Sequence, residues 1–240
     1  MIIDVSHHNG LIDWNVAGKY IDYAILRCGF GSNQPSHIDK QFNYNATQCE
    51  KYGIPYGVYL YSYARNFSNC KSEIKHILTR VKNRTITYPL YYDIEENSTF
   101  ETGEAKNFAA YFVSAIRRNG YKAGLYSCDS SFKQYFNSLE CDSKWVARYS
   151  SFPPSSNFDL WQYSSKNLVA GIKGCVDASV PLYNSIFSKE SYDRYVDEVI
   201  DGKYGNGKER KDNLVRLGLN YHRIQCLVNQ RICRGRTNGI

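Results

Sequence analysis

The chain has 240 residues and a formal net charge of +7, with 42% hydrophobic and 22% charged residues. This hydrophobic share supplies a packed core, which excludes an intrinsically disordered chain. No apolar run reaches the length of a membrane span, so we expect no insertion into a membrane. The length suits one barrel-sized domain with a small addition, or two domains of ordinary size.

Short apolar runs typical of β-strands recur through most of the chain. They lie at Ile2–Val5, Tyr23–Cys28, Tyr56–Tyr61, Leu90–Ile94, Ala123–Tyr126, Lys144–Ala147, Leu160–Tyr163 and Val176–Ala178. Helical patterns separate the earlier runs, at Asp39–Tyr52, Ser68–Val81, Thr102–Asn119 and Ser130–Asn137. The links between the last three runs, Arg148–Asp159 and Ser164–Cys175, show no helical period. This alternation predicts the α/β class, as an irregular TIM-like β/α barrel of about eight strands in which the later helices are missing.

The pattern of the sequence changes after a junction at Ser188–Ser191, from strands that recur along the chain to helices alone. Three short helices are expected beyond it: Tyr192–Ile200, Lys208–Leu217 closed by Gly218, and Tyr221–Ile232 capped by Asn220. The tail Arg234–Ile240 is expected to be frayed. We therefore divide the chain into a barrel domain at 1–187 and a three-helix module at 192–234. The module is near the lower size limit for independent stability.

Two acids follow a strand in the segment YPLYYDIEEN at residues 88–97. Residues two apart in a strand share a face, so Asp93 and Glu95 lie close together and one tends to keep its proton. A charged carboxylate beside a protonated carboxylic acid is the catalytic pair of a glycosidase. Most Asp-x-Glu pairs are solvated acids at the end of a strand. Here the apolar residues before the pair indicate a buried strand, and its C-terminal end is where barrel enzymes have their catalytic residues. Asp4 is expected at the same end of the barrel, and Asp177 in a short last strand that ends in the acid.

Tyrosine is heavily used, with 22 Tyr against 11 Phe and 3 Trp. Aromatic rings with a polar tip suit sugar rings, which offer C–H faces and hydroxyl groups. Several of these rings alternate along strand runs and so share a face that could point into a substrate cleft, although about half are expected to fill the barrel core. The candidate substrate-binding residues are Tyr59, Tyr61, Tyr63, Tyr126, Trp161 and the cation Arg27. Among them Tyr61 and Trp161 are favoured.

Neither a metal site nor a cofactor is expected. His7 and His8 lie near Asp4 in the sequence, but adjacent His side chains diverge and seldom bind one ion. The eight Cys residues form no CxxC pair, which argues against zinc clusters and redox motifs. An extracellular disulfide framework stays open, but Cys28 and Cys128 lie in apolar runs, as small core residues do. Free thiols in a reducing cytoplasm are favoured.

The end of the chain is basic, since five Arg and no acid lie between Asn213 and the C-terminus. Such a segment suits an anionic polymer, either a bacterial wall or a nucleic acid. No nucleic-acid fold motif is found, so the wall is favoured and nucleic acid is not an expected partner.

A series of motifs spans roughly residues 2–183 in the order IIDVSHHNG, DYAILRCGFG, GIPYGVYLYSYA, YPLYYDIEEN, NGYKAGLYS, WVARY, DLWQYSS and GCVDASV. This order resembles the lysozymes of glycoside hydrolase family 25. The resemblance implies an N-acetylmuramidase that cuts the β-1,4 bond between N-acetylmuramic acid and N-acetylglucosamine in bacterial peptidoglycan. One departure is the stretch from Arg27, Arg-Cys-Gly-Phe-Gly, which stands where many members carry Lys-x-Thr-Glu-Gly.

The resemblance also implies roles for the four acids. Glu95 would be the general acid that protonates the leaving oxygen. Asp93 would stabilise positive charge, on either an oxocarbenium or an oxazolinium, and Asp4 and Asp177 would complete the acidic cluster. The neighbouring aspartates and tyrosine rings are expected to raise the pKa of Glu95.

Beyond the barrel, the stretches YVDEVIDGKYGNGKERKDNL, LGLNY and IQCLVN follow one another between residues 195 and 229. They resemble the CW_7 cell-wall-binding repeat of phage lysins. The resemblance implies a module that binds the muramyl part of peptidoglycan, with Tyr204, Asn206 and Arg210 as candidate contacts. The alternative is that the Gly-Asn-Gly turn and Arg210 only shape the bundle. Such repeats often occur in tandem and this chain has one, so a homo-oligomer that gains avidity is a hypothesis.

The pattern of chemical motifs begins by residue 4, and no signal peptide is visible. This fits a phage or prophage endolysin, made in the bacterial host cytoplasm and acting on the cell wall after release. Two other classes stay open: a non-catalytic wall-binding protein, and a metal-dependent peptidoglycan deacetylase. The presence of all four acids argues against the first, and only His7 and His8 hint at the second.

Overall fold

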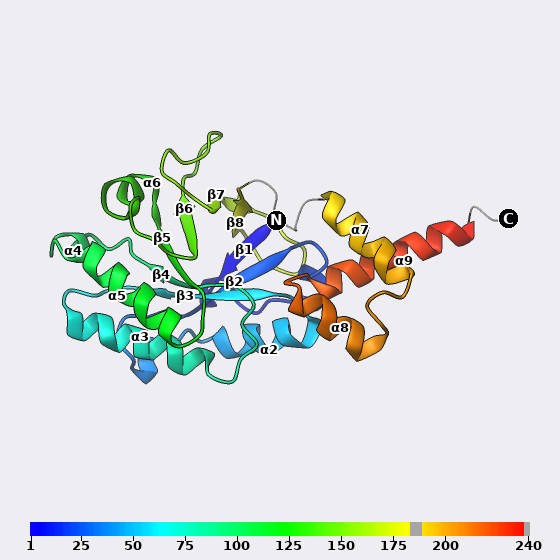
Figure 1. The fold of residues 1–240 in the computed structure, drawn as a ribbon, viewed down its shortest axis with the longest axis horizontal. Coiled ribbons are helices and arrows are strands. Elements are labelled where there is room, and N and C mark those ends of the chain that lie inside the picture. The colour runs from blue at the N-terminus through cyan, green and yellow to red at the C-terminus, as the bar shows by residue number, and fades with distance from the viewer. Residues whose placement is uncertain (183–188, 238–240) are drawn as a thin grey trace.

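The computed structural model describes residues 1–182 and 189–237, with side chains described for residues 1–182 and 192–232. Its strands close into one barrel in chain order (Figure 1): β1 (Ile2–Val5), β2 (Tyr23–Phe30), β3 (Tyr56–Tyr61), β4 (Leu90–Asp93), β5 (Ala123–Cys128), β6 (Ser143–Ala147), β7 (Leu160–Asn167) and β8 (Val176–Pro181). Neighbours from β1 to β7 are parallel, whereas β8 runs antiparallel to both β7 and β1. The predicted α/β barrel is confirmed, and each predicted strand corresponds to an observed one.

Helices cover only part of the barrel wall. The larger ones are α2 (Phe42–Tyr52), α3 (Phe67–Val81) and α5 (Ala105–Arg118), which pack against β2 to β5. Shorter elements are α1 (Trp14–Ala17), α4 (Asn97–Phe100), α6 (Asp129–Ser131), a π-helical turn at Phe132–Phe136 and 3-10 turns at His7–Asn9 and Pro35–His37. The links after β6 and β7, at residues 148–159 and 168–175, contain no helix, as predicted.

The start of α5 differs from the prediction, which placed it at Thr102. The helix begins at Ala105. The Thr102 hydroxyl accepts a hydrogen bond from the backbone N of Glu104 at 3.0 Å and donates one to the Thr99 carbonyl at 2.7 Å. Thr102 therefore stabilises a turn before the helix rather than capping its first turn.

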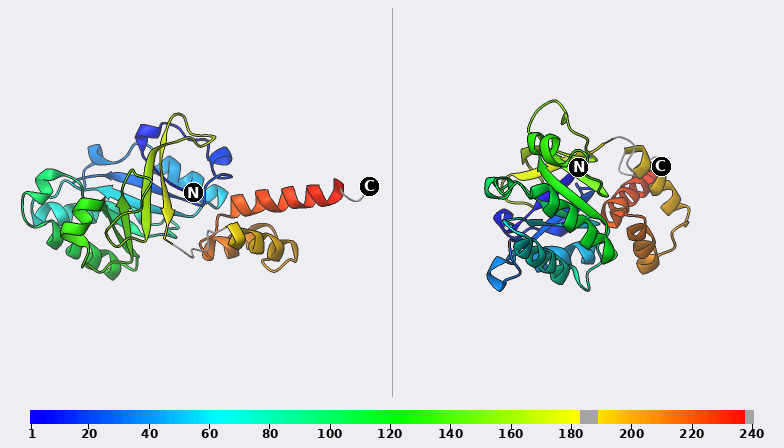
Figure 2. Two further views of the ribbon diagram at one scale, coloured as in Figure 1. Left: turned by 90° about the horizontal axis from the view of Figure 1, so that it is seen from above. Right: turned by 60° about the vertical axis from the view of Figure 1, so that its left-hand side comes forward.

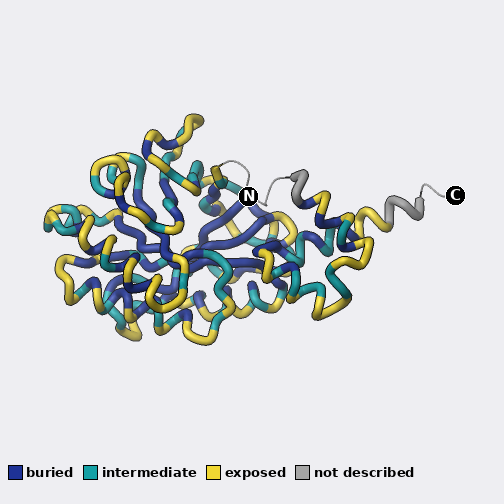
Figure 3. The backbone as a smooth tube through the Cα atoms, viewed as in Figure 1, coloured by how far each residue is buried: buried dark blue, intermediate teal, exposed yellow. Residues whose placement is uncertain are grey.

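Two apolar layers follow from the alternation of side chains along the strands. The interior of the barrel is filled by Ile2, Tyr23, Ile25, Tyr91, Tyr126, Trp145 and Leu160. A larger layer between the strands and the helices includes Ile3, Val58 and Phe112. Figure 3 shows the strands as a buried centre, surrounded by loops and by helices whose turns alternate between buried and exposed residues. A Cβ on Gly124 would lie 2.3 Å from Cδ1 of Tyr91, so the missing side chain lets the Tyr91 ring fill the interior.

The C-terminal part forms three helices, as predicted: α7 (Lys189–Ile200), α8 (Gly207–Arg216) and α9 (Tyr221–Thr237). They share a small core of Tyr192, Tyr195, Val196, Val199, Leu214, Leu219, Ile224 and Val228. Figure 2 shows α9 as a long rod that projects away from the barrel. The predicted fraying from Arg234 is wrong as far as Thr237, and residues 238–240 lie outside the described part. The predicted junction at Ser188–Ser191 falls partly on residues 183–188, which also lie outside it.

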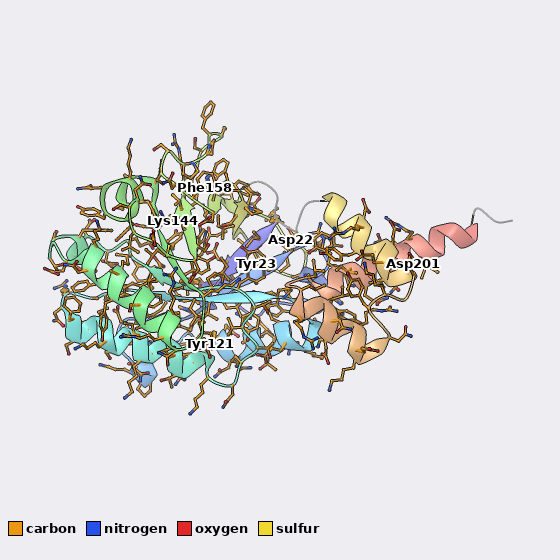
Figure 4. All side chains as sticks on the ribbon, viewed as in Figure 1. Asp22, Tyr23, Tyr121, Lys144, Phe158 and Asp201 are labelled. Atoms are coloured by element: carbon orange, nitrogen blue, oxygen red, sulfur yellow. The ribbon has the colours of Figure 1, made fainter. Side chains whose placement is uncertain are left out.

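These helices dock on the amino end of the barrel, where the strands begin. The Asn220 side chain is buried, and its Nδ2 donates to the carbonyls of Gly18 and Ile21 at 3.0 Å each. Its Oδ1 accepts from the backbone N of Arg223 at 3.0 Å, which confirms the predicted cap of α9. The Arg223 guanidinium pairs with Asp22, which Figure 4 labels beside Tyr23 on the side of the barrel nearest these helices.

Further bonds join the same surfaces. Lys211 Nζ donates to the carbonyls of Glu50 and Lys51, at 2.6 and 2.9 Å, in the last turn of α2. The Tyr88 hydroxyl donates to the carbonyl of Gly218 at 3.0 Å. The module is therefore fixed to the barrel by hydrogen bonds and ion pairs between named groups.

Two of the five arginines in the predicted basic C-terminal segment take part in ion pairs within the described residues. Arg223 is neutralised by Asp22, and Arg231 pairs with Asp193 at 2.7 Å and also with Asp197. These arginines are engaged in holding the fold together. The side chains of Arg234 and Arg236 lie outside the described part.

Within the described residues, no helix is both long and apolar enough to cross a membrane. The seven cysteines whose side chains are described are all unpaired. Cys28 is buried as predicted, whereas Cys128 is only half-buried. The prediction for Cys128 is wrong because it ends β5, where its Sγ contacts the hydroxyls of Ser130 and Ser131 at 3.2 and 3.3 Å.

Candidate active site

Four carboxyl groups gather at the carboxyl end of the barrel. Asp93 is the last residue of β4 and Glu95 follows two residues later. Asp4 on β1 pairs across the sheet with Asp177 on β8. Asp4 and Asp93 are buried, Asp177 is half-buried and Glu95 is exposed. The structure thus brings all four predicted acids to one end of the barrel.

The position of Asp177 within its strand differs from the prediction. Asp177 is the second residue of β8 and not its last. Because β8 runs antiparallel to its neighbours, its beginning lies at the end of the barrel where the other strands finish. The acid reaches the predicted place through a reversal of strand direction that sequence pattern did not indicate.

Each of the four acids has a raised pKa, mainly because the surrounding protein removes water from the carboxyl group and so penalises the charged form. For Asp93, the charges of Glu95 and Asp4 add to the effect of burial. For Asp4, the added charge is mainly that of Asp177, whose own pKa is raised by burial. These groups therefore hold protons to higher pH than free carboxyls do.

The pKa of Glu95 is raised, as predicted, but the causes differ from those expected. Loss of water around the carboxyl comes first, and the charges of Glu96 and Asp177 follow. Glu96 is the neighbour that sequence reasoning missed, although it is adjacent in the chain. Glu95 is exposed beyond the end of β4, yet its charge raises the pKa of Tyr61, Tyr126 and Tyr149, and the drying of the site by these rings stays a prediction.

Asp93 presents an unused acceptor. Its Oδ1 is buried and has no hydrogen-bond partner among the described residues. The Arg27 charge lowers the pKa of Asp93 against the raising effects of burial and the other acids. Arg27 is itself anchored, since its Nε donates to Oδ2 of the buried Asp39 at 2.9 Å. The predicted cation Arg27 therefore lies near the acids, and its bond to Asp39 holds it in place.

His7 and His8 do not diverge, contrary to the prediction. Their ring centroids lie 4.0 Å apart. His7 is bound to Asp39 through its backbone N at 3.0 Å and its Nδ1 at 3.1 Å, and it also contacts Arg27. Among the described residues, no three His, Cys, Asp or Glu side chains are grouped so that they could hold a metal ion.

The predicted aromatic residues separate into two sets. Tyr59 and Tyr126 pack inside the barrel around Trp145. Tyr61 and Tyr63 lie near its mouth, with ring centroids 5.1 Å apart, and Tyr63 is 47% exposed. The second set can meet a ligand from solvent, whereas the first set mainly shapes the interior.

Hydrogen bonds fix two of the candidate rings. The Tyr61 hydroxyl donates to Glu96 Oε1 at 2.7 Å, beside Glu95. The half-buried Trp161 donates from Nε1 to the carbonyl of Arg148 at 2.7 Å. Sequence reasoning also missed Gln162, which donates to Asp4. The available signal was its spacing from Leu160, since alternation on β7 directs both residues into the barrel.

In the module, the predicted wall contacts take part in internal bonding. The Tyr204 hydroxyl donates to Glu198 at 2.5 Å. The Arg210 guanidinium donates to the Gly205 carbonyl at 3.0 Å, to Gln225 at 3.0 Å and to Asn206 Oδ1 at 2.9 Å. These bonds hold the turn between α7 and α8, and contact of these side chains with glycan stays a prediction.

A closed barrel with buried carboxyls and an exposed, protonatable glutamate at the carboxyl ends of its strands defines a glycosidase. The model of the glycosyl hydrolases family 25 matches residues 3–172, and the CW_7 repeat model matches residues 193–232. The chain belongs to glycosyl hydrolase family 25. Both expected resemblances are confirmed.

Similar proteins agree with this assignment. The lysozyme of Streptococcus phage Cp-7 is 26% identical over 246 residues, covering 96% of this chain and 69% of that protein. The catalytic domain of endolysin ply40 from bacteriophage P40 of Listeria monocytogenes has a TM-score of 0.70 at 25% identity, over 76% of this chain and 92% of that one. The modular autolysin LytC from Streptococcus pneumoniae has a TM-score of 0.64 at 30% identity, over 74% of this chain and 45% of that one.

Proposed function

We propose that the protein is a lysozyme that hydrolyses the β-1,4 bond between N-acetylmuramic acid and N-acetylglucosamine in bacterial peptidoglycan. One observation carries the proposal: an exposed Glu95 with a raised pKa lies two residues beyond a buried Asp93 that has an unused acceptor oxygen. Membership of family 25 and similarity to a phage lysozyme support it.

In this reaction Glu95 is the general acid. Its carboxyl gives a proton to the glycosidic oxygen while the bond from that oxygen to the muramic acid C1 breaks. Positive charge then develops on the sugar, as an oxocarbenium or an oxazolinium, and Asp93 stabilises it. Water then adds at C1, and its proton returns to Glu95. The enzyme regains its starting protonation state, and one water is consumed for each bond that is cut.

Asp93 suits its role because its free Oδ1 can accept a hydrogen bond from the substrate. Asp4 and Asp177 keep the surroundings negative without needing to touch the sugar. On the outer side, the rings of Tyr61, Tyr63 and Trp161 offer surface for sugar contacts. The positive charge of Arg27 partly offsets the negative charge around Asp93.

We assign residues 1–187 to the catalytic unit and 192–234 to a wall-binding unit that recognises the muramyl part of peptidoglycan. The match to the CW_7 repeat supports the second assignment. Similarity to the phage Cp-7 lysozyme supports an endolysin that reaches the wall after release from the host cytoplasm. A single repeat gains from avidity, so we also propose a homo-oligomer. A monomeric mass by light scattering at working concentration would contradict that oligomer.

The test is digestion of purified peptidoglycan in the presence of EDTA, followed by mass spectrometry of the borohydride-reduced products. We expect muramitol at the new reducing ends. Glucosaminitol ends would show that the other glycosidic bond is cut. Loss of acetyl groups from intact glycan in a metal-supplemented sample would indicate a deacetylase instead.

A further inference from the structure

Gln162 on β7 lies inside the barrel with only 2% of its surface exposed. Its Oε1 accepts hydrogen bonds from the hydroxyls of Tyr126, at 2.9 Å, and Tyr149, at 3.0 Å. Its Nε2 donates to Oδ2 of Asp4 at 2.9 Å. The amide is therefore held from both sides, by two phenols and one carboxyl group.

The direction of the amide follows from these partners. The two tyrosine hydroxyls donate to one oxygen, which leaves the NH₂ group to face Asp4. The reverse orientation would set the amide oxygen against a carboxylate, acceptor against acceptor. A donor that faces a carboxyl group favours its charged form.

Asp4 needs such a donor because its surroundings favour the neutral form. Burial and the charges of Asp177 and Glu95 raise the pKa of Asp4, whereas the Gln162 bond lowers it. The ionisable groups that interact with this part of the barrel are Asp177 on β8, Asp93 on β4, Glu95 beyond β4, Arg27 on β2, Tyr59 on β3, Tyr126 on β5 and Tyr149 after β6.

We propose that Gln162 is a positioning residue which, clamped by Tyr126 and Tyr149, directs its N–H to Asp4, orients that carboxyl group and favours its ionised form over the neutral one. The catalytic consequence rests on the lysozyme activity proposed above. Tyr149 is 60% exposed while its hydroxyl is anchored on the amide.

The direct test follows the carboxyl groups and does not require activity. The full chain, labelled with ¹³C at the aspartate carboxyls, is titrated by NMR, with Asp4 and Asp177 assigned from Asp4→Asn and Asp177→Asn. Both signals are followed because the two groups titrate as a pair. In Gln162→Leu the Asp4 midpoint should move up by about one pH unit, the size expected for the loss of a hydrogen bond to a charged group. An unchanged or lower midpoint would overturn the proposal.

Gln162→Met is the second variant, because it fills a similar space in the barrel without a donor to Asp4. It should move the Asp4 midpoint upward as well, and circular dichroism shows which variants fold. If Gln162→Leu does not fold, the titration of Gln162→Met decides the question.

Activity gives an independent readout. In the folded variant, the acidic limb of kcat/KM on peptidoglycan should move to higher pH, whereas a purely structural role would lower the rate at all pH values equally. A wild-type chain that does not cut peptidoglycan would refute the proposed function, yet the NMR titration would still test Gln162.

Discussion

At the amino end of the barrel, the side chains that join the docked helices to the strands meet fixed partners, whereas at the carboxyl end carboxyl groups are crowded together. Asn220 satisfies two carbonyls and caps a helix, and Arg223 meets Asp22. Asp93 keeps a buried oxygen that no described residue pairs with, and Asp4 lies opposite Asp177. One end therefore contributes stability, and the other holds charges that oppose burial and are useful for chemistry.

The largest expected effect is at the carboxyl end. Glu95→Gln should lower the rate of peptidoglycan cleavage by about a thousandfold, because the leaving oxygen loses its proton donor. The fold should persist, since Glu95 is exposed. Turbidity loss of purified walls and the thermal midpoint measure the two quantities, and a variant with more than a tenth of the wild-type rate would remove Glu95 from this role.

Glu96→Gln is the matched control, one residue away. The rate at the optimum should fall by less than roughly tenfold, since Glu96 is not the acid. A general acid must be protonated, so activity is lost as pH rises through the Glu95 pKa. Glu96 raises that pKa, so its neutralisation should move the high-pH limb of the rate profile to lower pH. An unmoved limb would mean that the two carboxyls do not interact.

The next effect is on stability at the amino end. Asn220→Ala leaves two buried carbonyls without a donor and removes the cap of α9. The expected loss is about 2–3 kcal/mol, or roughly 5–10 °C in the thermal midpoint. Asn229→Ala is the control, because that exposed side chain bonds Gln225 at the surface and its loss should cost less than about 0.5 kcal/mol. Equal midpoints for the two variants would show that the docked helices do not stabilise the barrel.

A smaller effect on stability, in this case a gain, is expected from a substitution at the carboxyl end. Asp4 has a raised pKa in the folded state, so the folded chain binds more protons there than the unfolded chain. Stability from this group is present at acidic pH and is lost as pH rises above the unfolded pKa. Asp4→Asn removes that penalty and should raise the thermal midpoint at neutral pH by about 2–4 °C while lowering activity. Differential scanning calorimetry at pH 4 and pH 7 measures it, and a midpoint lower at both would contradict the pattern.

The smallest effect concerns the contact between α8 and α2. Lys211→Met removes a charged donor from the carbonyls of Glu50 and Lys51 at the end of α2. We expect a loss of about 0.5–1 kcal/mol by urea unfolding, because these carbonyls can turn to water. Lys208→Met, on the same helix, is the control. A loss as large as that of Asn220→Ala would mean that this contact is as important as the buried amide.

The sequence by itself determined the strands, the missing later helices, the acids Asp93 and Glu95, and the two family resemblances. These features depend on local alternation, on helical period and on motif order, which a single sequence carries. The cap at Asn220 was readable for the same reason, because a capping residue lies beside the helix that it caps.

Only the tertiary structure decided the direction of β8, the place of Gln162 and the docking of the module. Asp177 meets Asp4 because β8 runs antiparallel, and Gln162 meets Asp4 across 158 positions of sequence. Asn220 likewise contacts Gly18 across 202 positions. Such contacts depend on how the barrel closes and not on the residues beside them, so no local pattern encodes them.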